Sequence, residues 1–177
     1  MKLVILDRDG TINHDSDEYI KSPEELRPIK GSLEAIARLT QADYRVVVAT
    51  NQSGIARGLF DTRTLFAIHD TLLRALAQVG GRIDAFFFCP HKADDRCACR
   101  KPQPGMLLEV ARRFNVALDD TYMVGDAQRD LEAAAAAGAK PVLVLTGRGA
   151  ATREEGKLPP GTRVFPDLAA FAEHLAP

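Results

Sequence analysis

Acidic side chains at the end of the first apolar run are the residues best suited to chemistry. Residues 3–6 are apolar and stop at Asp7, and Asp9 follows two positions later, so both carboxylates can face one pocket. Carboxylates this close repel each other, and Mg²⁺, which prefers one or two carboxylates together with phosphate oxygens, would relieve the repulsion. For this stretch alone, a strand followed by an ordinary Asp-Gly turn is the alternative.

Polar residues of reactive type also follow three later apolar runs. They are Thr50 and Asn51 after residues 45–49, Cys89 and His91 after residues 85–88, and Asp126 after residues 121–124. The carboxyl ends of parallel strands share one edge of a sheet, where ligands bind, so we expect these side chains to meet there. A hydroxyl, an amide, a lysine and several carboxylates suit a phosphate that is held by donors and a cation.

The elements that must position these residues alternate between strand and helix patterns, which implies right-handed βαβ units. Helical spacing begins at Ser32, Thr62 and Pro104, and it recurs over residues 131–137 and 168–175. Two further strands are expected at 142–145 and 164–165, with loops at 12–30 and 147–163. The predicted fold is α/β, a doubly wound, Rossmann-like parallel sheet with helices on both faces.

Composition and charge exclude several classes of protein. The formal net charge of -1 gives no basic face for a nucleic acid. The first apolar run is too short for a signal-peptide core, and no stretch is long enough to span a bilayer. We therefore expect a single cytoplasmic domain over residues 1–177, monomeric, with no nucleic-acid or membrane partner.

All three cysteines gather with one histidine in a short segment, as Cys89, His91, Cys97 and Cys99. The paired C-x-H and C-x-C spacings supply the four donors of a closed tetrahedral zinc site. Such a zinc would be structural and would stiffen the loop that presents Arg100 and Lys101. The alternative is three free cysteines and a surface histidine. The remaining histidines are expected to be surface or helix residues; they are His14, His69 and His174.

The same positions resemble the four motifs of the haloacid dehalogenase superfamily of phosphohydrolases, in order and over nearly the whole chain. The matches are Asp7-Arg8-Asp9-Gly10-Thr11 for motif I, Thr50 for motif II, Lys101 for motif III, and Gly125-Asp126 with Asp130 for motif IV. The closer resemblance is to the D-glycero-D-manno-heptose 1,7-bisphosphate phosphatase family, through residues 50–58, 89–91, 97–102 and 104–108. The related histidinol-phosphatase group lacks the continuation at residues 53–58.

The resemblance implies a role for each motif residue. Asp7 would be the nucleophile that forms an aspartyl-phosphate, and Asp9 would act as general acid and then as general base. Mg²⁺ would bind the Asp7 carboxylate, the Asp9 backbone carbonyl and Asp126. The residues that would hold the phosphoryl oxygens are Thr50, Asn51 and Lys101. Asp130 would orient Lys101 or lie beside the metal.

The implied reaction removes the C7 phosphate of the heptose bisphosphate to give heptose 1-phosphate, a step towards nucleotide-activated heptose for the lipopolysaccharide core. Arg100 is expected to bind the retained phosphate, with Arg57 as a second candidate. Larger members of the superfamily carry a cap domain, but no gap here is long enough for one. Several heptose phosphatases have lysine where this chain has Ala127, so one substrate contact is in doubt.

Two alternatives stay open at this point. A histidinol-phosphate phosphatase would share the strand ends and the Cys/His loop. A phospho-receiver signalling domain also uses acidic residues, threonine and lysine on a doubly wound sheet. In receivers the phospho-accepting aspartate typically ends the third strand, whereas that strand here ends in Cys89, which argues against the receiver.

Overall fold

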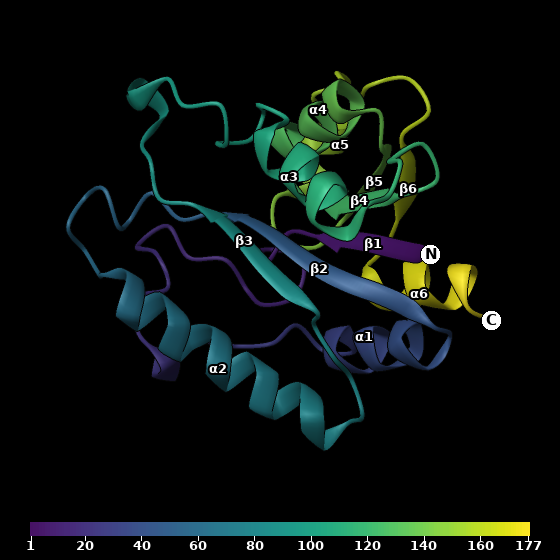
Figure 1. The fold of residues 1–177 in the computed structure, drawn as a ribbon, viewed down its shortest axis with the longest axis horizontal. Helices are drawn as coiled ribbons and strands as arrows, with labels where there is room; N and C mark the ends of the chain where they lie inside the picture. The colour runs from purple at the N-terminus through teal and green to yellow at the C-terminus, as the bar shows by residue number, and fades with distance from the viewer.

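The structure is a computed structural model that describes residues 1–177. One parallel sheet runs through the molecule in the order β3-β2-β1-β4-β5-β6 (Figure 1). Its strands are β1 (Lys2–Leu6), β2 (Tyr44–Asn51), β3 (Ala85–Cys89), β4 (Tyr122–Gly125), β5 (Lys140–Val144) and β6 (Arg163–Phe165). The predicted doubly wound α/β fold is confirmed.

Helices cover both faces of this sheet (Figure 1). One face carries α1 (Ser32–Gln41), α2 (Thr62–Gln78) and α6 (Leu168–Leu175), and the other carries α3 (Gly105–Phe114) and α4 (Gln128–Ala137). Three short helical elements complete the chain: the 3₁₀ turns η1 (Pro23–Glu25) and η2 (Ala93–Asp95), and α5 (Gly149–Glu154). None of the helices combines the length and the apolar character needed to cross a membrane.

The apolar run of β1 is continuous because both of its faces are buried. Val4 and Leu6 enter the core under α1, α2 and α6, while Leu3 and Ile5 enter the core under α3 and α4. Parallel strands covered on both sides have this pattern. The central position of β1 places the residues after it deep in the sheet edge.

The strand order reverses beside β1, which makes this the point where a doubly wound sheet binds ligands. The chain runs outward through β2 and β3 and then returns to β4 on the other side of β1. Gly10 makes the sharp exit there, with φ of 83°. A Cβ at Gly10 would lie 2.1 Å from Asp126 Oδ2, so only glycine lets the two strand ends approach.

Two segments that were expected to be loops contain more structure. The expectation of a plain loop at 147–163 was wrong, because α5 forms there and Thr152 Oγ1 donates to the Asp126 carbonyl at 2.9 Å. The segment at 12–30 contains η1 and is tied back by β-bridges from Asn13 to Asp9 and to Pro28. In both segments, tertiary contacts supply order that the local sequence pattern does not announce.

Candidate active site

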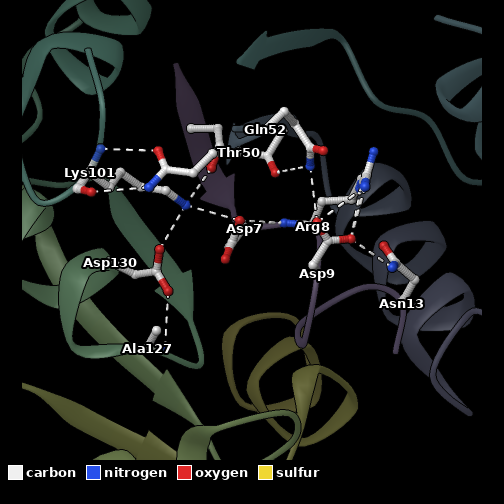
Figure 2. A network of polar contacts seen from close by, with 11 residues as sticks. Asp7, Arg8, Asp9, Asn13, Thr50, Gln52, Lys101, Ala127 and Asp130 are labelled. Atoms are coloured by element: carbon white, nitrogen blue, oxygen red, sulfur yellow. Dashed lines mark hydrogen bonds and ion pairs between the residues drawn. The ribbon is translucent and has the colours of Figure 1, made fainter. Parts of the chain in front are cut away.

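Lys101 is a buried cation whose ammonium group points towards Asp7 and Asp130 (Figure 2). Its Nζ lies 2.9 Å from Asp7 Oδ1 and 2.7 Å from Asp130 Oδ1, and it donates to the Ala49 carbonyl at 2.7 Å. Burial alone would lower the pKa of Lys101, but the charges of Asp130 and Asp7 outweigh burial and raise that pKa. The side chain therefore stays an ammonium, which is the charge that phosphoryl oxygens require.

Asp7 is fixed by the sheet, because its N–H continues the ladder by donating to the Val124 carbonyl at 2.8 Å. The contacts of its carboxylate fall on Oδ1, from the Arg8 N–H and from Lys101. This leaves Oδ2 without a hydrogen-bond partner. Burial and the Asp130 charge raise the pKa of Asp7 to about 6, although Lys101 opposes them. The free oxygen is suited to nucleophilic attack.

Asp126 and Asp130 flank the start of α4. Asp130 Oδ2 accepts from the Ala127 N–H at 3.0 Å and so caps the helix. Asp126 Oδ2 accepts from the Arg148 N–H at 2.8 Å, while its Oδ1 is buried and has no partner. Burial, followed by the charges of Asp7 and Asp130, raises the pKa of Asp126 to about 7. The protein itself therefore places too little positive charge beside these carboxylates to balance their negative charge.

A divalent cation fits this group of carboxylates. Oxygens of Asp7, Asp126 and Asp130 all lie within 4.8 Å of one another. Asp130 is already committed to Lys101 and to the helix cap, so the orphaned oxygen of Asp126 and the Asp7 carboxylate are the atoms that need a cation. Mg²⁺ is a hard cation that takes such oxygen ligands. The residues present therefore fit the predicted metal.

Four donors hold the Asp9 carboxylate (Figure 2). Arg8 donates from Nε at 3.0 Å and from Nη2 at 3.1 Å, Asn13 from Nδ2 at 2.9 Å, and Gln52 from Nε2 at 3.0 Å. A carboxylate accepts about four hydrogen bonds, so this one is saturated. Burial would raise the pKa of Asp9, but the charge of Arg8 and the hydrogen bonds lower it. Asp9 therefore rests here as the carboxylate.

Thr50 and Asn51 at the end of β2 differ in their hydrogen-bond partners. The Thr50 hydroxyl is buried and accepts from Gln52 Nε2 at 2.9 Å, which leaves its own proton to be donated. Both polar atoms of the Asn51 amide bind the backbone of Lys101. A phosphate contact by the Asn51 side chain stays a prediction, because in this structure that side chain positions Lys101 instead.

Asp7, Asp9, Thr50 and Asn51 line a cavity of about 240 Å³. Its other walls come partly from the three expected segments, which are residues 12–30, the stretch after Thr50 and the loop before Lys101, and partly from Arg129 and Arg148, which were not expected there. Arg57 is exposed and does not line the cavity, whereas Arg100 does. A hollow of about 910 Å³ between α1 and α6 is larger, but none of the candidate site residues lines it. The larger volume alone therefore does not identify the active site. The arginines that line the smaller cavity are Arg100, Arg129 and Arg148.

The predicted zinc ligands converge. Sγ of Cys89 lies 3.6 Å from Sγ of Cys97 and 3.5 Å from Nδ1 of His91, which is 3.3 Å from Sγ of Cys99. Tetrahedral zinc, with Zn–S bonds of about 2.3 Å and Zn–N bonds of about 2.0–2.1 Å, places its ligands roughly 3.5–3.8 Å apart. The four donors therefore fit a closed zinc site. The Arg100 N–H donates to Cys97 Sγ at 3.3 Å, which joins this cluster to the active-site loop.

Several known proteins are similar to this chain in sequence and in fold. Residues 98–171 match the family model described as HAD-hydrolase-like. The D-glycero-beta-D-manno-heptose-1,7-bisphosphate 7-phosphatase of Bordetella bronchiseptica is 63% identical over 175 residues, which cover 99% of this chain and 98% of that protein. The chain belongs to this phosphatase family. A member from Pseudomonas putida is 53% identical over 175 residues, and the match covers 99% of this chain and 99% of that protein.

A solved structure agrees with the family assignment. The crystal structure of the D,D-heptose 1,7-bisphosphate phosphatase from Bordetella bronchiseptica, complexed with magnesium and phosphate, superposes with a TM-score of 0.98 at 63% identity. The match covers 99% of this chain and 98% of that one. As a member of the phosphatase family, the chain is a phosphoric monoester hydrolase, so the receiver alternative falls away.

The sequence pattern indicated the candidate reacting groups of this phosphatase but not much of what surrounds them. It placed His69 only as a surface or helix residue, whereas this residue of α2 is buried beside Arg8. It did not single out Gln52, which joins Asp9 to Thr50. The only available signal for Gln52 was its place in the stretch after Thr50. His69 belongs to no motif and carried no signal, because its partner Arg8 lies far away in the chain.

Proposed function

We propose that this enzyme hydrolyses the C7 phosphate of D-glycero-D-manno-heptose 1,7-bisphosphate. The observation that carries the chemistry is the Asp7 carboxylate, which has one oxygen free beside the buried ammonium of Lys101. The family supplies the substrate, because its members at 53–63% identity are named for this bisphosphate. The product, heptose 1-phosphate, suits the synthesis of nucleotide-activated heptose for lipopolysaccharide.

The reaction takes two displacements. Asp7 Oδ2 attacks the C7 phosphorus and forms an aspartyl-phosphate, while the bond from phosphorus to the sugar oxygen breaks and Asp9 gives that oxygen a proton. Asp9, now a carboxylate, takes a proton from water, which attacks the aspartyl-phosphate and releases inorganic phosphate. Thr50 and Lys101 hold the phosphoryl oxygens in both steps. To act as the acid, Asp9 must first be protonated. The protonated oxygen then gives up one of the four hydrogen bonds that the carboxylate accepts in this structure.

Two metals complete the proposal. Asp7, the backbone carbonyl of Asp9 and Asp126 would hold Mg²⁺, which when bound supplies positive charge between the attacking carboxylate and the phosphate. The Cys/His cluster would hold zinc as a structural ion with no open position. Its role is mechanical, since the Arg100 N–H contacts Cys97 and the Arg100 side chain donates to the His91 carbonyl at 3.2 Å.

The retained phosphate is assigned to the arginines of the cavity. Arg100 lines the cavity directly before Lys101, and a planar guanidinium binds two phosphate oxygens at once. Arg129 also lines the cavity, and its Nε is buried without a partner, which leaves donors for a ligand. It stands two residues after Ala127, so the cation that is absent at that position has a substitute on the same helix. Arg57 is the weaker candidate because it lies outside the cavity.

We further propose that residues 1–177 act as one domain without a cap, as a monomer in the cytoplasm. Thiolate ligands such as those of the Cys/His cluster persist in a reducing compartment.

The proposal is tested by phosphate release from heptose 1,7-bisphosphate, histidinol phosphate and simple hexose phosphates under one set of conditions with Mg²⁺. We expect the highest kcat/KM on the heptose bisphosphate. A higher value on histidinol phosphate would overturn the substrate assignment and leave only the phosphatase chemistry.

A further inference from the structure

His69 lies inside the protein although it belongs to no motif. It is 4% exposed on the inner face of α2, and its ring stacks on Phe86 of β3 with centroids 4.1 Å apart and planes 12° apart. Burial, followed by the charge of Arg8, lowers the pKa of His69 to about 3, so the ring is neutral. A neutral imidazole has one nitrogen that accepts a hydrogen bond.

That nitrogen receives Arg8, which is wholly buried. Arg8 Nη1 lies 3.2 Å from His69 Nε2, and because a guanidinium only donates, Nε2 is the acceptor and the ring proton sits on Nδ1. The other two nitrogens of Arg8, Nε and Nη2, donate to the two oxygens of Asp9 (Figure 2). All three guanidinium nitrogens thus have a side-chain partner, and only one of those partners is outside the catalytic motif.

We propose that His69 is a positioning residue for Asp9 and acts through Arg8. This inference rests on the proposed acid–base role of Asp9. Without the imidazole, Nη1 of Arg8 is a buried donor with no acceptor, and the guanidinium gains by turning towards another one. Such a turn breaks the fork on Asp9, and proton transfer depends on atoms held within a fraction of an ångström. Stacking on Phe86 keeps His69 in place.

The dependence of rate on the leaving group tests this role. An alkoxide leaving group, as in the heptose bisphosphate, needs the proton of Asp9, whereas p-nitrophenolate leaves without one. kcat/KM includes only the steps up to loss of the leaving group, so later hydrolysis of the aspartyl-phosphate does not enter. We expect His69→Phe to lower kcat/KM on the bisphosphate by about 10- to 100-fold, against less than about threefold on p-nitrophenyl phosphate.

Companion variants make the result decisive. His69→Gln keeps an acceptor for Arg8 and should recover most of the loss, while His69→Leu should repeat the effect of His69→Phe. Leu72→Ala, which removes a buried side chain one turn further along α2, should leave the ratio of the two kcat/KM values unchanged. The ratio is taken within one preparation, so a reduced folded fraction does not alter it.

Asp9→Asn separates failure of this inference from failure of the proposed function. In one outcome, Asp9→Asn lowers kcat/KM on the bisphosphate selectively, but His69→Phe lowers kcat/KM equally on both substrates or on neither. That result refutes the role of His69 and leaves the role of Asp9 standing. If Asp9→Asn itself shows no selectivity, the proposed acid role is wrong, and the inference falls with it.

Discussion

The side chain of Asn51 hydrogen-bonds to the backbone of Lys101 in both directions. Its Nδ2 donates to the Lys101 carbonyl at 3.0 Å, and its Oδ1 accepts from the Lys101 N–H at 3.1 Å. The last residue of β2 therefore fixes the loop that carries the buried lysine. The Lys101 side chain enters the site from this anchored point and reaches Asp7 and Asp130.

Replacing Asn51 should therefore damage catalysis through Lys101. Each of the two hydrogen bonds contributes about 0.5–1.5 kcal/mol, so Asn51→Ala should lower kcat/KM by roughly 5- to 150-fold. Steady-state kinetics at saturating Mg²⁺ measure the effect. Gln103→Ala, an exposed change in the same loop, is the control and should leave kcat/KM unaltered. An active Asn51→Ala enzyme would show that the anchor is dispensable.

Magnesium affinity should rise with pH between about 5.5 and 7.5. The pKa of Asp7 is raised to about 6 and that of Asp126 to about 7, in both cases chiefly by burial, so protons compete with the cation below these values. Titration calorimetry at several pH values gives the dissociation constant and the protons released. A dissociation constant that stays constant across this range would contradict the raised pKa values.

The same two carboxylates should make the metal-free protein less stable as pH rises. Both pKa values are raised above the ordinary value of 3.8, so from about pH 4 to pH 7 the folded protein binds more protons than the unfolded chain. These groups therefore contribute stability at low pH that is lost as pH rises through their folded pKa values. Urea unfolding without metal should show the decline, and Mg²⁺ should reduce it.

Purified protein should contain about one zinc ion per chain, as a closed four-ligand site requires. Cys97→Ser should lose the ion and lower activity, because the Arg100 N–H contacts Cys97 Sγ. Elemental analysis and kinetics are compared with Asp94→Ala, an exposed change in the same loop. Chelator-free protein that holds no zinc when freshly purified would exclude the site.

The strands were predictable because each carries a local signal, and so was the placing of the candidate site residues at the strand ends. A branched apolar run that stops at Asp7 marks both the strand and its candidate functional end, and the candidate zinc ligands are recognisable because they lie close together in the sequence. The sheet then had to bring Thr50 and Asp126 to the same edge, since parallel strands leave little choice.

What could not be predicted depends on contacts between distant segments. The sequence shows Arg8 only as a residue of the first motif, and its contact with His69 forms only when α2 packs onto the sheet. The phosphate contact expected of Asn51 stays a prediction, and its hydrogen bonds to the backbone of Lys101 could not be foreseen, because they form only when the Lys101 loop packs against β2. Helix α5 is too short to show a period, and its link from Thr152 to Asp126 exists only in the folded chain.

Arg100 should read the retained phosphate. Loss of a hydrogen bond to a charged group is worth about 1.5–3 kcal/mol, so Arg100→Ala should lower kcat/KM on the bisphosphate by roughly one to two orders of magnitude. A sugar monophosphate should be affected much less. Arg57→Ala is the matched control, because Arg57 is exposed and outside the cavity. Equal losses on both substrates, or a larger loss for Arg57→Ala, would remove Arg100 from this role.

The regiochemistry of one turnover shows which phosphate this enzyme removes. Heptose 1,7-bisphosphate is incubated with the enzyme and Mg²⁺, and ³¹P NMR identifies which sugar phosphate remains. We expect that the signal of the phosphate ester at C1 persists, that the signal of the C7 phosphate is replaced by that of inorganic phosphate, and that Asp7→Asn releases no phosphate. A product that keeps its C7 phosphate, or turnover by Asp7→Asn, would contradict the proposed function.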